Sequence, residues 1–400
     1  MNVSNMILNS TLAHVVFMNF LIILNYTFWF VGYGNIFGPI VILLYLSILV
    51  YLAFRSIIIK KNQINIFLFI FALLFITSFS PLTDWDARSI WLFHAKRIYF
   101  ESNLFAQLDN YAEWSHNDYP TLVPAFIASL AKLIGTWNEL FPKLGVVLTA
   151  IPPLLVIGKI LKKSLLIIIL LIFLLFVADR LLFNGYMDAI LGLYLTAGVL
   201  TWIYALKIKH NKNLALLLYV YSSLNFTILS LIKNEGILML LIIFIVSMLI
   251  LFKYSKYQYF LKTIYVFIMP SIFIISWKYM CFLHNINNDL TSGNTISMFL
   301  ERIHSLENLL LIIKYLCVHP WMIFFLIIVV FVKKKNIKIG DLIVIGIVLM
   351  YISSIFLIYL TTPNALEWHL QTSAERVLLP IEVLLFSFLI FKMKNLKRIF

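Results

Sequence analysis

The stretch GILMLLIIFIVSMLILF, residues 236–252, decides the fold class of this chain. An uncharged apolar run of this length is typical of a helix that crosses a bilayer, because lipid offers no partners for an exposed backbone. Similar runs recur along the 400 residues, of which 62% are hydrophobic and only 12% are charged. The sequence therefore predicts an all-α polytopic membrane protein.

About twelve such runs are expected to cross the membrane, so that residues 1–400 form a single transmembrane domain. They lie near residues 7–30, 38–59, 64–82, 143–161, 164–182, 188–206, 213–232, 236–252, 261–283, 310–332, 339–361 and 377–392. The first run lacks both a basic region before it and a small-residue cleavage site, which favours a retained helix over a signal peptide.

The charges predict which ends of these helices face the cytoplasm. Most of the 31 lysines and arginines cluster at alternate ends of the apolar runs. The positive-inside rule then places both termini in the cytoplasm of an inner or plasma membrane. With this topology, all acids except Asp341 and Glu382 fall on the extracytoplasmic side. The net charge of +14 is explained by contacts with membrane lipids, and no nucleic-acid partner is expected.

The longest connection, residues 83–142, is expected to be an extracytoplasmic loop. Loops of this length usually carry function. Trp91, Ala95 and Ile98 recur at helical spacing, which predicts an amphipathic helix on the membrane surface. Residues 119–133 follow a proline-containing turn and predict a second interfacial helix.

Four short motifs lie at the predicted outer ends of the spans. They are Asp84-Trp85-Asp86-Ala87-Arg88, His116-Asn117-Asp118-Tyr119-Pro120, Lys233-Asn234-Glu235-Gly236 and Trp368-His369-Leu370-Gln371-Thr372-Ser373-Ala374-Glu375-Arg376. In combination they resemble motifs of bacterial GT-C-type glycosyltransferases, the relatives of protein O-mannosyltransferases and aminoarabinose transferases. The resemblance implies a GT-C-like fold, with juxtamembrane helices in the first large outer loop and an acidic pair in the active-site cavity.

The same resemblance implies an enzyme that transfers a sugar from a polyprenyl-phosphate donor to a lipid, glycan or protein acceptor at the extracytoplasmic face. Two departures stand out. Trp85 separates Asp84 from Asp86, whereas many relatives have adjacent acids followed by Ala-Arg-Tyr, and two extra spans precede the acidic loop. A lipid-linked glycan polymerase or ligase is an alternative that keeps the carrier. A transporter or flippase is disfavoured, because its ionisable groups would lie within the spans.

Glycosyl transfer requires a carboxylate that takes the acceptor's proton and cations that hold the departing phosphate. Asp86 or Asp84 can supply the catalytic base, and the choice between them stays open. The two carboxylates can also bind a divalent cation, which prefers oxygen ligands, so a metal cofactor is neither required nor excluded. In the alternative structural interpretation, these acids cap the helix that begins near Ala87.

His116, Asp118 and Tyr119 form the next candidate group. A histidine and a carboxylate two residues apart can orient an acceptor or share a metal ion with the first acids. In the structural alternative, Asp118 accepts hydrogen bonds from the backbone of a turn before Pro120. The sequence favours neither interpretation.

Six cations on the outer side are candidates for binding phosphate: Arg88, Lys96, Arg97, Lys233, Arg302 and Arg376. Arg376 is the first choice, because it begins the last predicted span, with His369 in the same connection as a further substrate contact. Its alternative role is a headgroup contact, and the same alternative is favoured for Lys96 and Arg97.

Lys233 and Glu235 lie between two apolar runs that have almost no loop between them. Ionisable residues at such a depth either face a cavity or pair with each other. Substrate binding and a structural pair are therefore both expected for them. Asp188 and Glu367 are weaker candidates, and Asp188 can serve only to cap its helix.

Overall fold

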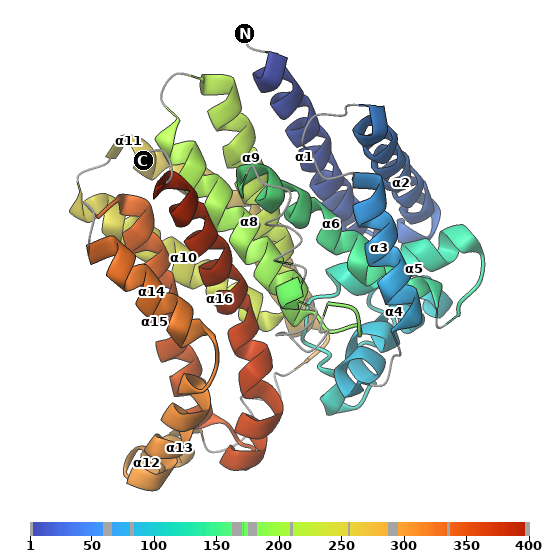
Figure 1. The fold of residues 1–400 in the computed structure, drawn as a ribbon. Coiled ribbons are helices and arrows are strands. Elements are labelled where there is room, and N and C mark those ends of the chain that lie inside the picture. Colours follow the sequence, from blue (N-terminus) through green and yellow to red (C-terminus); the bar gives the residue numbers. More distant parts are fainter. Residues whose placement is uncertain are drawn as a thin grey trace.

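The computed structural model describes residues 3–58, 66–80, 84–138, 140–161, 170, 172–174, 182–208, 211–254, 257–286, 295–333 and 337–396. Within these ranges the regular elements are all helices (Figure 1). Their bounds are α1 Val3–Phe30, α2 Gly34–Ile58, α3 Ile66–Phe79, η1 Ala87–Trp91, α4 Leu92–Glu101, η2 Glu113–Ser115, α5 Leu122–Ile134, α6 Phe141–Leu161, α8 Asp188–Lys207, α9 Lys212–Ser230, α10 Asn234–Lys253, α11 Tyr257–Leu283, α12 Thr295–Ile303, α13 Leu306–Cys317, α14 Trp321–Lys333, α15 Ile339–Thr361 and α16 Leu366–Leu396.

Eight of these helices are long and apolar enough to cross a membrane, and a bent pair can supply a ninth span. The eight are α1, α2, α6, α8, α9, α10, α11 and α15. The expectation of an all-α polytopic membrane protein is confirmed at this level. The expected total of about twelve spans is not reached by the described residues.

The other four predicted spans differ from the structure in distinct ways. The run at 64–82 forms α3. Its apolar part, Leu68–Phe79, is shorter than the eight helices that can cross a membrane. Most of the run at 164–182 lies outside the described residues. The run at 310–332 falls on α13 and α14, which are bent by 74° relative to each other. Pro320 lies in that break, where its ring prevents a continuous helix.

The fourth, at 377–392, is part of a longer helix, α16, that already begins at Leu366. The sequence had suggested that His369 and Arg376 lie in a connection before the last span. In the structure, the segment that carries both residues is helical. The apolar run marked only the most hydrophobic part of α16, because charged residues precede it. Consequently Arg376 has a position fixed by the helix.

The helix α8 lies at the centre of the packing, in contact with α6, α9 and α16. Nearly all of its side chains are buried. Gly192 allows α16 to come close, because a Cβ atom at that position would lie 3.0 Å from the Cα atom of Pro380. Small residues serve the same purpose at many membrane helix contacts. This contact holds the middle of α16 beside the first turns of α8.

The long connection between α3 and α6 folds into η1, α4, η2 and α5. Its two predicted helices exist, but both pack into the protein. Trp91, Ala95 and Ile98 are buried, and α4 contacts α5. The helix α5 is buried from Leu122 to Ala131 and contacts α1, α2 and α6. Both predicted helices of this connection are therefore present, and each contributes buried residues to the packing of the protein.

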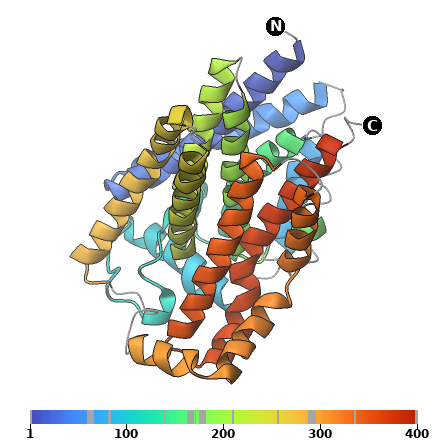
Figure 2. The same cartoon turned by 90° about the vertical axis from the view of Figure 1, so that its left-hand side faces the viewer.

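Figures 1 and 2 show both termini at one end of the helical bundle. The opposite end carries α4, α12 and α13 (Figures 1 and 2). The residues quoted in the four motifs gather toward the end that carries α4.

Candidate functional site

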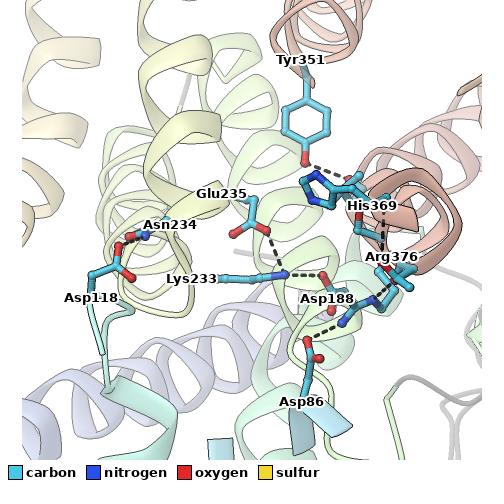
Figure 3. A network of polar contacts seen from close by, with 12 residues as sticks. Asp86, Asp118, Asp188, Lys233, Asn234, Glu235, Tyr351, His369 and Arg376 are labelled. Atoms are coloured by element: carbon cyan, nitrogen blue, oxygen red, sulfur yellow. Dashed lines mark hydrogen bonds and ion pairs between the residues drawn. The ribbon is translucent and has the colours of Figure 1, made fainter. Parts of the chain in front are cut away.

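A network of charged side chains joins three helices and the residue before η1 (Figure 3). Asp86 precedes η1, Asp188 begins α8, Lys233 and Glu235 flank the start of α10, and Arg376 lies in α16. Together they contain one more acidic than basic group. Residues from widely separated parts of the sequence therefore meet in one site.

Asp86 and Arg376 form an ion pair, although 290 residues separate them in the sequence. The Nε atom of Arg376 also donates a hydrogen bond to the carbonyl oxygen of Thr372, at 3.1 Å. Its Nη2 group has no acceptor among the described residues. The guanidinium carbon lies 5.0 Å from the centre of the Tyr186 ring. Arg376 is thus oriented by three contacts and keeps donors for a ligand.

The electrostatics of this pair favour a charged arginine. Burial alone would lower the pKa of Arg376, but Asp188 and Asp86 raise it above its ordinary value. Burial and the carboxylate of Asp86 raise the pKa of the Tyr186 hydroxyl to about 12. Arg376 therefore stays cationic and Tyr186 stays neutral at any physiological pH.

The structure distinguishes Asp86 from Asp84. Asp86 is the N-cap residue of η1, yet its side chain makes no capping hydrogen bond and turns to Arg376 instead. This argues against the structural interpretation of Asp86 as a helix cap. Asp84 is half-buried and its side chain forms no ion pair with any described residue.

Lys233 links two carboxylates. Its Nζ atom lies 3.0 Å from Oδ1 of Asp188 and 2.9 Å from Oε1 of Glu235. The Lys233 and Asp188 side chains are only 6% and 2% exposed, so the charges are shielded from solvent. Burial would lower the pKa of Lys233, but Asp188 and Glu235 raise it above its ordinary value. Asp188 is therefore a partner of Lys233 and not a simple cap of α8.

A second polar cluster lies next to the first, on the other side of the short α9–α10 connection. Asn234 donates to Oδ2 of Asp118 at 2.5 Å, and Lys278 donates to Oδ1 of Asn234 at 3.1 Å. The indole of Trp277 donates to the carbonyl oxygen of Asp118. Because Lys233 and Asn234 are consecutive, the backbone at the start of α10 fixes the position of one cluster relative to the other.

Tyr119 connects the long loop with the first cluster. Its ring stacks on Trp91 at 5.6 Å and on His116 at 4.6 Å between ring centres. The Nζ atom of Lys233 lies 5.9 Å from the centre of the same ring. His116 has a left-handed backbone, with a φ of 48°. These contacts give both His116 and Tyr119 places near the site.

His369 lies on α16, two turns before Arg376 (Figure 3). Its ring meets that of Tyr359 edge to face, with 5.1 Å between ring centres. The carbonyl oxygen of His369 accepts a hydrogen bond from Ser373, whose hydroxyl also contacts Tyr359 at 2.8 Å. His369 therefore belongs to the wall of the site rather than to its charged centre.

Several candidates from the sequence have other surroundings. Arg88 and Lys96 are exposed. Glu367 is exposed and accepts a hydrogen bond from Gln371, one turn further along α16. None of these three side chains has an ion pair with the described residues of the charged network, so the structure does not bring them into it.

Two of the candidate arginines bind backbone carbonyl oxygens instead. Arg97 donates to the carbonyl groups of Leu104 and Ala106 and thereby fixes the loop after α4. Arg302 donates to the carbonyl groups of Tyr359, Thr362 and Asn364 and holds α12 against the end of α15. Both side chains are buried. Their guanidinium groups are engaged in folding contacts and have a structural role.

Some residues of the site were not identified from the sequence. They are Tyr186, Asn234, Lys278, Tyr359 and Tyr351, whose hydroxyl donates to the carbonyl oxygen of Val377 in α16. Asn234 lies within a quoted motif, and Tyr186 lies two residues before Asp188, so proximity in the sequence was a usable signal for both. Lys278 and the other two tyrosines lie inside apolar runs, where nothing marked them as site residues.

The described residues contain no group of three or more histidine, cysteine, aspartate or glutamate side chains that could hold a metal ion. The carboxylates of the network instead have Lys233 and Arg376 as counter-charges. Comparisons of the chain with protein-family models, with curated proteins and with solved structures gave no match.

Proposed function

We propose that this protein is a glycosyltransferase of the GT-C type, which transfers a sugar from a polyprenyl-phosphate donor to an acceptor at the extracytoplasmic face of a bacterial plasma membrane. The observation that supports the proposal most is the ion pair of Asp86 and Arg376. These are the two residues for which the sequence suggested complementary roles, a base and a phosphate-binding cation.

In the proposed reaction, the hydroxyl group of the acceptor gives its proton to the carboxylate of Asp86. The acceptor oxygen forms a bond to the anomeric carbon, and the bond from that carbon to the phosphate oxygen breaks. The bonding electrons stay on the phosphate, which gains one negative charge. Arg376 stabilises that charge through the N–H groups that the protein leaves without an acceptor.

The ion pair also suggests the order of events. A phosphate that binds Arg376 competes with Asp86 for the same guanidinium group, because both ligands are oxyanions. Donor binding thus weakens the hold of Arg376 on Asp86 and makes the carboxylate available to the acceptor. In this proposal, Asp86 becomes an effective base only when the donor is in place.

The experiment compares the purified wild-type protein with Asp86→Asn, Arg376→Gln and the control Arg88→Gln. Each purified protein is returned to lipid membranes. Transfer of a radiolabelled sugar from an undecaprenyl-phosphate donor is then measured with lipid, glycan and protein acceptors. Removal of a positioned base lowers rates by about 10²–10⁴-fold. Asp86→Asn and Arg376→Gln should show losses of this order, whereas Arg88→Gln should stay within about twofold, because its side chain is outside the network. Full activity of Asp86→Asn would reject the proposed base.

A further inference from the structure

Asp188 and Glu235 each use only one carboxylate oxygen to bind Lys233. Their second oxygens, Oδ2 of Asp188 and Oε2 of Glu235, are buried and have no hydrogen-bond partner among the described residues. A buried acceptor without a donor is costly, and natural structures contain few of them. Two such oxygens on either side of one ammonium group indicate a place where a ligand supplies the donors.

The surroundings of these oxygens restrict the chemistry of that ligand. Both free oxygens belong to carboxylates, so an anionic group placed directly against them would be repelled. The aromatic ring of Tyr186 lies beside the cation Arg376. Carboxylate oxygens accept hydrogen bonds from hydroxyl groups, and aromatic faces pack against apolar C–H groups. A neutral sugar ring offers both kinds of group.

The position of the two carboxylates relative to the proposed phosphate site supports the same ligand. Asp188 and Asp86 both raise the pKa of Arg376, so the Asp188 carboxylate also lies near this guanidinium group. The donor's sugar is covalently bound to the phosphate that Arg376 is proposed to hold. Figure 3 shows Asp188 between Lys233 and Arg376, and Glu235 contacts Lys233 as well. A sugar attached to that phosphate would therefore extend toward these two carboxylates.

We propose that Asp188 and Glu235 bind the hydroxyl groups of the donor's sugar ring, and that Lys233 is the positioning residue that orients both carboxylates. This inference rests on the proposed function. It assigns a substrate class, namely donors with a neutral sugar. Donors with a uronic acid are disfavoured, because their carboxylate would meet Asp188 and Glu235.

The test measures binding of three probes to the full-length protein in lipid nanodiscs: undecaprenyl phosphate, undecaprenyl phosphoglucose and undecaprenyl phosphoglucuronate. The wild-type protein should bind the glucose lipid about tenfold more tightly than the sugar-free lipid, which corresponds to about one good hydrogen bond to a charged group. It should bind the glucuronate lipid no more tightly than the sugar-free lipid.

The variant Glu235→Gln should lose most of the preference for the glucose lipid and still bind undecaprenyl phosphate within about twofold of the wild type. Asp188→Asn should have the same effect and serves as a second variant. Glu367→Gln is the matched control, because it removes one acid from α16 outside the network. Thermal unfolding of each variant identifies those that have not folded.

Two results would overturn the inference. In the first, Glu235→Gln lowers binding of the sugar-free lipid as much as that of the glucose lipid, which indicates a purely structural role. In the second, the folded variant keeps the full preference. If the wild-type protein binds none of the three lipids, the proposed function fails as well, and this outcome is distinct from the first two.

Discussion

Replacement of Lys233 by methionine should strongly destabilise the protein. The substitution keeps a long side chain but removes the only ammonium group between Asp188 and Glu235. Two carboxylates, of which Asp188 is 2% exposed and Glu235 17% exposed, then remain close together without the cation that contacts both. Loss of one partner from a buried ion pair costs about 3–5 kcal/mol, whereas an exposed pair contributes only about 0–1 kcal/mol.

The free energy of unfolding is measured by titration with SDS in mixed micelles, with tryptophan fluorescence as the signal. Neutral pH is suitable, because the pKa of Lys233 is raised. Its contribution to stability is complete below the pKa of an unfolded lysine, about 10.4, and is lost only as the pH rises through the higher folded value.

A matched variant separates lost charge from lost packing. When Lys233→Met is combined with Asp188→Asn and Glu235→Gln, no unpaired charge remains among the three. Replacement of all members of a buried ionic group by neutral ones is often nearly neutral. The triple variant should therefore recover most of the lost stability. The argument is refuted if Lys233→Met costs less than about 1 kcal/mol, the value of an exposed pair, or if the triple variant is as unstable as the single one.

Two further substitutions test the folded loop between α3 and α6. Burial and the nearby Arg97 lower the pKa of His94 to about 3, so between pH 6.5 and 5 only the unfolded state gains a proton on this residue. Wild-type stability should fall over that interval by about 2 kcal/mol more than that of His94→Gln, as measured by unfolding at both pH values. Ser129→Ala should lower the free energy of unfolding by about 2 kcal/mol or more, because the buried donors of Asn25 and Trp29 lose their shared acceptor. The matched variant Ser47→Ala, at an exposed serine, should change it little.

The sequence was informative about elements and about residue types, but less so about partners. Apolar runs identified eight helices that are long enough to cross a membrane. Three of the charged motifs contained Asp86, Lys233, Glu235 and Arg376 of the network. The pairing of Asp86 with Arg376 could not be derived from spacing, because 290 residues lie between them. Only the family resemblance suggested that they share a site.

The arginines show most clearly that the sequence does not predict the partner of a charged side chain. Arg97, Arg302 and Arg376 all lie on the predicted outer side, where a phosphate ligand or a headgroup contact was expected. In the structure, the first two donate to backbone carbonyl groups and only Arg376 binds a carboxylate. A guanidinium group serves either purpose with the same donors. The distinction depends on which backbone groups are left unsatisfied, and a single sequence does not contain that information.

The orientation of the bundle leads to a further prediction, because proton transfer beside a lipid-linked donor at the outer face requires Asp86 on the extracytoplasmic side. The exposed Asn110 lies in the loop after α4, and the exposed Asn213 lies in the first turn of α9. Cys281 and Cys317 are replaced first, so that each variant has a single cysteine. A membrane-impermeant maleimide should then label Asn110→Cys in intact cells, and Asn213→Cys only after permeabilisation. The reverse pattern would place Asp86 in the cytoplasm, where basic residues and not acids are expected to concentrate, and would remove the basis for an extracytoplasmic transfer reaction.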